Sequence, residues 1–118
     1  MGNYAISMFK DVTKNEQVAV ISVNANRRVK WSDIISKGSI DSSEIDPCYV
    51  VEKVLKHKVK TIILAHNHPN GTLAPSIADK EATEALVKIF KSIGIEVLDH
   101  IIVSGTRYFS MKEAGFRF

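Results

Sequence analysis

The sequence predicts a layered α/β domain, in which a mixed β-sheet carries helices on its faces. Two runs, residues 17–23 and 61–65, are almost continuously apolar, which is typical of strands covered on both sides. Two amphipathic helical patterns, residues 46–55 and 76–93, alternate with the predicted strands. With 118 residues, the chain is predicted to form one domain, residues 1–118.

The N-terminal half is predicted to hold a β-hairpin and a helix. Residues 4–9 are mixed apolar and fit either an edge strand or a short helix. After the strand 17–23, the Asn-rich segment 24–27 indicates a turn, because Asn tolerates positive φ, and residues 29–35 form the return strand. A polar loop, residues 38–46, ends at Asp46 and Pro47, a typical N-cap and first helical residue. The apolar stripe of that helix is predicted to consist of Val50, Val51, Val54 and Leu55.

The C-terminal half is predicted to alternate strands and helices. The strand 61–65 follows a helix, so we expect it to lie parallel to an earlier strand. The helix 76–93 ends at Gly94, and residues 95–98 and 100–103 form one or two strands. A turn at 104–106 leads to a short pairing strand at 108–109, and Ser110 to Glu113 resembles the capping box of a last helix. The buried face of the long helix is predicted to carry Ala78, Ala82, Leu86, Ile89, Phe90 and Ile93.

The chemistry of the chain is concentrated in residues 65–79. His66 and His68 lie two residues apart on an extended segment, so their side chains point the same way. Asp79 lies in the first turn of the next helix, and the loop 69–75 can fold it back toward the histidines. A catalytic zinc site needs three such ligands and a fourth position for water, whose pKa the metal lowers to about 7. The sequence therefore predicts a Zn²⁺ site and a metallohydrolase.

A zinc hydrolase also needs a group that takes the proton of the water, usually a glutamate. Glu16 ranks first among the available glutamates, because it begins the first central strand and would be held rigidly. Ser76 has two compatible interpretations. The spacing Ser76-x-x-Asp79 is a helix capping box with Asp in place of Glu, and the same hydroxyl could face the reacting carbonyl.

Other features point to structure more than to chemistry. Cys48 is the only cysteine, which excludes an internal disulfide and favours a reduced, cytoplasmic setting. No apolar run reaches the ~20 residues of a membrane span. The net charge is +3. The two densest basic groups, residues 27–30 and 56–60, are interpreted as solvated faces in preference to a nucleic-acid-binding patch.

A second polar pair, Asp99 and His100, is followed by an apolar strand. The apolar surroundings favour a structural role, in which the Asp99 carboxylate orients a buried histidine or caps nearby backbone, over a second metal site or a proton relay. A supporting contact to the predicted metal ligands stays open. Three aromatic residues could stack on nucleic-acid bases, but they are interpreted as core side chains in preference to that role: Trp31, Tyr108 and Phe109.

The spacing His-x-His, seven residues, Ser-x-x-Asp resembles the JAMM motif of the JAB/MPN metalloprotease superfamily. Residues 64–71 and 97–103 are similar to hallmark segments of its RadC-like family, and the likeness extends from about residue 16 to 115. The resemblance implies an MPN/JAB1-like core related to the cytidine-deaminase-like folds. It also implies zinc ligation by His66, His68 and Asp79, a Glu16 that acts on the metal-bound water, and a Ser76 that stabilises the oxyanion. Asn70 stands where many relatives have serine.

These observations predict a JAMM-type zinc metallopeptidase that cleaves a peptide or isopeptide-like amide bond in a peptide or protein substrate. The alternative is a nucleic-acid-associated, DNA repair-related module with a structural or phosphoester-cleaving zinc. RadC-like proteins usually carry a helix-hairpin-helix module before this domain, and the fifteen residues ahead of Glu16 leave no room for one. We therefore expect a separated C-terminal domain or a short relative. A third interpretation, a degenerate interaction domain, is disfavoured because the predicted ligands are retained.

Overall fold

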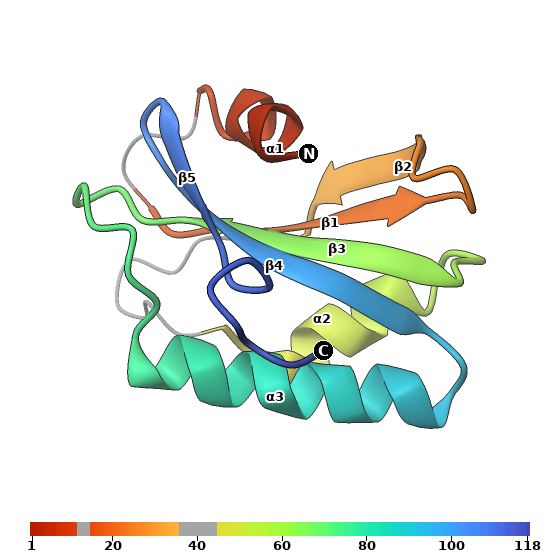
Figure 1. The fold of residues 1–118 in the computed structure, drawn as a ribbon. Coiled ribbons are helices and arrows are strands. Elements are labelled where there is room, and N and C mark those ends of the chain that lie inside the picture. The colour runs from red at the N-terminus through yellow and green to blue at the C-terminus, as the bar shows by residue number, and fades with distance from the viewer. Residues whose placement is uncertain (12–14, 36–44) are drawn as a thin grey trace.

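Five strands in the order β2-β1-β3-β4-β5 form the central sheet of the protein, seen here in a computed structural model (Figure 1). The structure describes residues 1–11, 15–35 and 45–118. Strand β1 is antiparallel to both of its neighbours, β3 and β4 pair in parallel, and β5 returns antiparallel to β4. The elements are α1 (Gly2–Met8), β1 (Val18–Val23), β2 (Val29–Ile34), α2 (Pro47–Val54), β3 (Thr61–Asn67), α3 (Ile77–Ser92), β4 (Glu96–Ser104) and β5 (Arg107–Ser110).

Helices cover both faces of the sheet, with α1 on one side and α2 and α3 on the other (Figure 1). Each face has its own apolar cluster, because successive residues of a strand point to opposite faces. Leu64 packs in the cluster under α2 and α3, and its neighbour Ala65 packs in the cluster under α1. All six residues of β1 are buried, as predicted for a strand covered on both sides.

The signals for helix ends are confirmed. The Asp46 carboxylate caps α2 by accepting the backbone N–H groups of Cys48 and Tyr49. Gly94 follows α3 with φ of +80°, a conformation that glycine adopts without steric cost. The N-terminal segment, which fitted a strand or a helix, is the helix α1. Most of the predicted polar loop 38–46 lies outside the described residues.

Three predictions about elements need correction. β3 does run in the same direction as the earlier strand β2, but the two do not pair, because β1 lies between them and is antiparallel to both; the parallel partner of β3 is the later strand β4. The last helix is absent from residues 111–118, where the chain forms turns, although Ser110 Oγ does accept the Glu113 N–H. The apolar stripes are narrower than predicted. Three of their members are exposed, namely Leu55, Ile89 and Ile93.

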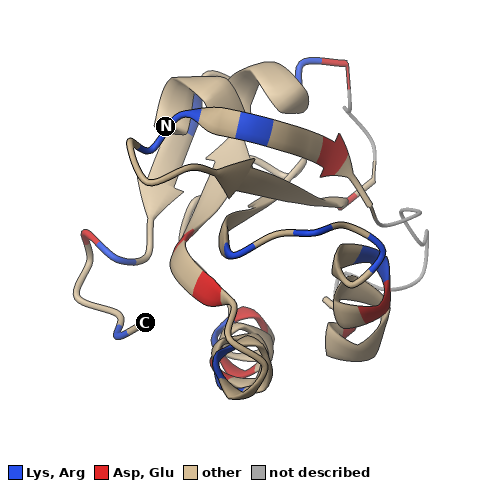
Figure 2. Cartoon of the chain, turned by 90° about the vertical axis from the view of Figure 1, so that its right-hand side faces the viewer, with Lys and Arg blue, Asp and Glu red and all other residues tan. Residues whose placement is uncertain are grey.

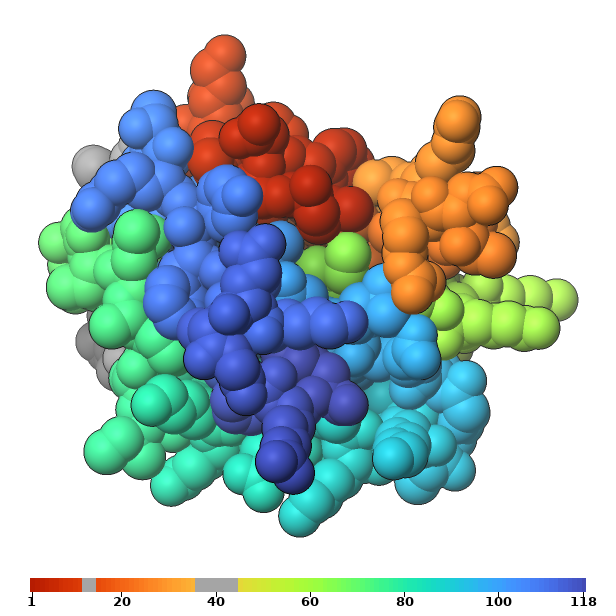
Figure 3. All heavy atoms as spheres, in the orientation of Figure 1, coloured from red at the N-terminus to blue at the C-terminus, as the bar shows by residue number. Residues whose placement is uncertain are grey.

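The two termini complete the packing around the sheet. In the space-filling view, α1 (red) adjoins the β4–β5 hairpin (blue), and the C-terminal segment (dark blue) lies between that hairpin and α3 (Figure 3). Phe118 packs against the cluster under α2 and α3. None of the helices in the described ranges has the length and apolar content needed to cross a bilayer.

Candidate metal centre

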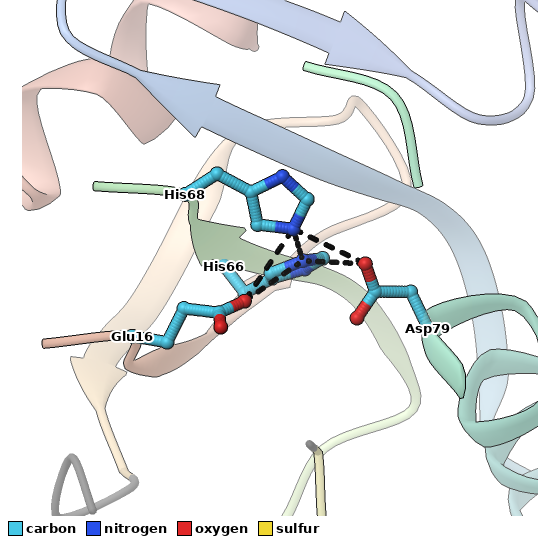
Figure 4. A group of neighbouring side chains, drawn as sticks. All are labelled: Glu16, His66, His68 and Asp79. Atoms are coloured by element: carbon cyan, nitrogen blue, oxygen red, sulfur yellow. Dashed lines mark hydrogen bonds and ion pairs between the residues drawn. The ribbon is translucent and has the colours of Figure 1, made fainter. Parts of the chain in front are cut away.

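The carboxyl end of β3 and the amino end of α3 meet at one end of the sheet, and four polar side chains converge there (Figure 4). β3 extends two residues beyond the predicted strand, so His66 lies inside it and His68 follows its last residue. Val18 of β1 pairs with His66, which brings Glu16, two residues earlier in the chain, beside the histidines. Asp79 arrives from the first turn of α3.

The ligand atoms of Glu16, His66, His68 and Asp79 all lie within 4.8 Å of one another. The Nε2 atoms of the two histidines are 2.8 Å apart. Asp79 Oδ2 lies 3.1 Å from His68 Nε2 and 3.4 Å from His66 Nε2. Glu16 Oε1 lies on the other side, 3.4 Å from His68 Nε2 and 3.9 Å from His66 Nε2. Two imidazoles therefore stand between two carboxylates.

Asp79 is held by the start of α3. Ser76 is the N-cap, and its hydroxyl oxygen accepts the Asp79 N–H at 3.0 Å. The Asp79 Oδ2 atom accepts the Ser76 N–H in return at 2.9 Å, so the capping box is complete. A carboxylate in this position is also stabilised by the positive end of the helix dipole. Asp79 thus belongs both to the cap of α3 and to the cluster of four side chains.

Asn67 fixes the segment that carries Glu16. Its buried side chain accepts the Gln17 N–H on Oδ1 at 2.6 Å and donates from Nδ2 to the Asn15 carbonyl oxygen at 3.0 Å. The sequence left open whether Asn67 binds backbone or substrate. The structure shows that it binds the backbone on both sides of Glu16, a role for which the sequence carries no local signal.

His68 is oriented by the loop that follows it. Its Nδ1 lies 3.1 Å from the Thr72 carbonyl oxygen, which can only accept, so Nδ1 carries a proton. The main chain of His68 donates to the Val103 carbonyl oxygen at 2.8 Å and accepts the Ser104 hydroxyl at 2.8 Å. The ring therefore presents Nε2 to the other three side chains.

Burial and hydrogen bonding set the charges of the metal-free site. Partial burial raises the pKa of Glu16 to about 7; the His68 ring opposes this rise and Asp79 adds to it. Burial would raise the pKa of Asp79, but the His66 and His68 rings beside its carboxylate hold it well below its usual range. The hydrogen bond to Asp79 raises the pKa of His68, whereas burial lowers the pKa of His66. The metal-free site thus holds a proton where a cation could bind.

The residues fit a metal ion. Asp79 Oδ1 is buried and has no hydrogen-bond partner among the described residues, an arrangement that is costly unless a further group satisfies it. Two imidazole nitrogens and carboxylate oxygens are a donor set suited to Zn²⁺ and to other borderline divalent ions. The cluster of Glu16, His66, His68 and Asp79 could therefore bind a metal.

Thr83 and His100 lie directly behind His66. His100 Nε2 is 2.6 Å from His66 Nδ1, and His100 Nδ1 is 2.6 Å from the Thr83 hydroxyl. Burial holds the pKa of His100 well below its ordinary value. The sequence suggested a supporting contact for His100 but did not single out Thr83, although its position one turn after Asp79 was a usable signal.

Asp99 does not orient the His100 ring. Its Oδ1 accepts the main-chain N–H groups of His100 and Lys112, and its Oδ2 accepts the Ser110 hydroxyl at 2.5 Å. The interpretation of Asp99 as a cap for nearby backbone is therefore confirmed.

The sequence profile of the RadC-like JAB domain matches residues 1–116. The chain belongs to the RadC-like JAB domain family. The predicted resemblance is thus confirmed, and the mixed five-stranded sheet with three helices among the described residues is consistent with a JAB/MPN domain.

Proteins from distant microbes are similar to this RadC-like JAB domain. The UPF0758 protein of Finegoldia magna is 41% identical over 98 residues, which cover 83% of this chain and 44% of that protein. UPF0758 protein STH371 of Symbiobacterium thermophilum is 40% identical over 100 residues, 85% of this chain and 43% of that protein. UPF0758 protein YeeS of Escherichia coli is 35% identical over 102 residues, 86% of this chain and 69% of that protein. The chain thus spans less than half the length of the first two relatives.

Proposed function

We propose that this RadC-like JAB domain is a zinc-dependent hydrolase of the JAMM type, which cleaves a peptide or isopeptide-like amide bond. The observation that carries the proposal is the convergence of Glu16, His66, His68 and Asp79, with one buried Asp79 oxygen that has no hydrogen-bond partner in the part of the chain that the structure describes. When bound, Zn²⁺ would supply Lewis-acid polarisation of a water and of a carbonyl oxygen.

The protein residues divide the remaining work. His66, His68 and Asp79 hold the metal with their Nε2 and carboxylate atoms. Glu16 stands across the histidines from Asp79, and its pKa of about 7 suits a group that accepts a proton from water and passes it to the leaving nitrogen. Ser76 accepts the Asp79 N–H, so its own O–H remains available to donate to the developing oxyanion.

Metal analysis and turnover test the proposal. Protein purified without a histidine tag should contain about one zinc per chain, and His68→Ala should remove it. Glu16→Gln should keep the metal and lose turnover of a peptide and isopeptide panel, whereas Glu81→Gln on the exposed face of α3 should change neither. Activity that survives in Glu16→Gln would show that another group moves the proton. A chain that binds no divalent ion would refute the proposal as a whole.

A second candidate function, nucleic-acid binding, is favoured by one observation. The β1–β2 hairpin carries Arg27, Arg28 and Lys30, and the α2–β3 loop carries Lys56, Lys58 and Lys60. The rings of Trp31 and His57, stacked 3.7 Å apart, join the two segments. Both segments lie at one end of the sheet, where their Lys and Arg positions are blue (Figure 2). Within the described part of the chain, none of these six cations forms an ion pair.

This basic surface is separate from the metal centre. Lys60 of this surface directly precedes β3, and His66 lies near the end of β3. At ~3.3 Å per residue, these six residues along the strand separate Lys60 from His66 by about 20 Å. Binding of a labelled duplex at 50 and 200 mM salt is the test, because phosphate contacts weaken steeply with salt. Neutralising Lys56, Lys58 and Lys60 should then reduce the salt dependence, while neutralising Lys80 and Lys88 of α3 should not. Absence of salt-dependent binding would exclude this candidate.

A further inference from the structure

A buried chain of hydrogen bonds leads from the metal centre into the protein. His66 Nδ1 contacts His100 Nε2 at 2.6 Å, His100 Nδ1 contacts Thr83 Oγ1 at 2.6 Å, and Thr83 Oγ1 contacts the Asp79 carbonyl oxygen at 2.8 Å. The exposed fractions of His66, His100 and Thr83 are 1%, 0% and 0%. Because water does not reach these groups, each contact needs a proton from one of the protein atoms that it joins.

The order of the protons follows from the last contact. Two oxygens 2.8 Å apart require a hydrogen between them, and the Asp79 carbonyl has none to give, so the single Thr83 proton points to it. Toward His100, Thr83 can therefore only accept, and His100 must carry its proton on Nδ1. A fully buried imidazolium would lack a carboxylate partner here, so His100 is neutral and its Nε2 is an acceptor.

The tautomer of His66 is then determined. His66 must donate from Nδ1 to His100 Nε2, because no other proton can occupy that contact. A neutral His66 with its proton on Nδ1 has a lone pair on Nε2, and Nε2 is the atom that faces His68, Asp79 and Glu16. A metal ligand needs that lone pair.

We propose that Thr83 and His100 are positioning residues that hold His66 in the tautomer with a lone pair on Nε2 and thereby increase the affinity of the site for a divalent cation. This inference rests on the proposed metal site. Supporting hydrogen bonds of this kind typically change metal affinity 10–100-fold when they are removed. The same helix supplies both the ligand Asp79 and, one turn later, the anchor Thr83.

A β-bulge in β4 makes the chain possible. Ile62 pairs with Val97 and Ile63 pairs with Asp99, so Leu98 is an extra residue opposite β3. Val97 packs under α2 and α3, yet Ile101 and Val103 pack under α1. If the side chains of β4 alternated strictly between the two faces of the sheet from Val97 onward, the His100 side chain would point toward α1. The extra residue turns it toward α3 and Thr83, in keeping with the frequent occurrence of bulges beside active sites.

The test combines a tautomer measurement with a metal titration. Long-range ¹H–¹⁵N NMR of the metal-free protein, which has four histidines, reads which ring nitrogen of each carries a proton. In the wild type, the proton of His66 is expected on Nδ1 and that of His100 on Nδ1. Thr83→Val removes the hydroxyl at nearly unchanged volume, and Zn²⁺ affinity measured against a chelator should fall 10–100-fold. Thr83→Ser restores the hydroxyl and should remain within about threefold of the wild type.

Thr61→Val, at the opposite end of β3, is the matched control and should leave both measurements unchanged. A His66 proton on Nε2 in the wild type overturns the inference even if Thr83→Val fails to fold. Unchanged Zn²⁺ affinity in a folded Thr83→Val overturns the inference alone and leaves the proposed function intact. A wild type that binds no divalent cation overturns both.

Discussion

Glu16 is expected to destabilise the metal-free protein at the pH where it would act. Its pKa is raised by burial from 4.5 to about 7, which means that folding disfavours the charged carboxylate. Between these two pH values the folded protein binds more protons at Glu16 than the unfolded chain does, so this contribution lowers stability as pH rises. The full effect is present above about pH 7 and absent well below pH 4.5.

The magnitude follows from the size of the rise. At about 1.4 kcal/mol for each pH unit, a rise from 4.5 to about 7 corresponds to roughly 3.5 kcal/mol. The side chain is 18% exposed, and screening by solvent reduces the expected effect to about 1–2 kcal/mol. Glu16→Gln, which keeps the shape and removes the charge, should therefore stabilise the metal-free protein by about that amount at pH 8.5 and by much less at pH 5.

Urea unfolding with a chelator present, followed by circular dichroism, measures this difference. With the slope usual for a small domain, the midpoint of Glu16→Gln should lie roughly 0.5–1 M higher at pH 8.5. Glu81→Gln makes the same chemical change on the exposed face of α3 and should shift the midpoint little at either pH. A variant less stable than the wild type at pH 8.5, or equally stabilised at both pH values, would refute the reasoning.

Three other predictions follow from the site and the core. Asn67→Ala removes the hydrogen bonds that hold the backbone on both sides of Glu16. Kinetic assays should show turnover lowered about 10–100-fold, whereas Zn²⁺ affinity measured against a chelator should be nearly unchanged. Equal losses of turnover and affinity would contradict this role of Asn67. His68 must lose its Nε2 proton to bind a metal, and its hydrogen bond to Asp79 raises its pKa. Below that raised pKa, Zn²⁺ affinity measured by calorimetry should therefore fall about tenfold for each pH unit of acidification. An affinity that does not change with pH would argue against His68 as a ligand. Phe90→Ala should cost about 3–5 kcal/mol of unfolding free energy in urea unfolding, because the ring is fully buried. Ile93→Ala, at the C-cap of α3 where the side chain is 49% exposed, should cost less than about 1 kcal/mol, and similar losses in the two variants would contradict the assigned core face.

Local signals in the sequence predicted most elements, because capping and periodicity act over a few residues. Asp46, Ser76 and Gly94 each mark a helix end through contacts within three residues. The failed last helix after Ser110 shows the limit of such signals. Its serine does cap a turn, but it also donates to Asp99 of β4, and no long-range packing extends the turn into a helix.

The histidine pair and the Ser-x-x-Asp spacing were enough to predict that His66, His68 and Asp79 lie close together. The backbone geometry of a strand end and of a helix start restricts where these three side chains can lie. Glu16 was a weaker choice, and its position depends on the antiparallel pairing of β1 with β3, a strand that the sequence led us to expect parallel to an earlier one. Asn67 and Thr83 act through contacts 17–52 residues away along the chain; no short pattern marks Asn67, and the only local signal for Thr83 is its position one turn after Asp79.

The amino-acid order by itself determined where most strands and helices begin, and which two imidazoles and which carboxyl group of α3 would meet, since those outcomes depend on neighbours along the chain. Only the folded sheet decided the partner of each strand and the extra residue at Leu98 that rotates His100 beneath His66. Pairing and bulges are selected by competition among distant backbone groups for hydrogen bonds and buried surface, and that competition has no counterpart in any short stretch of sequence.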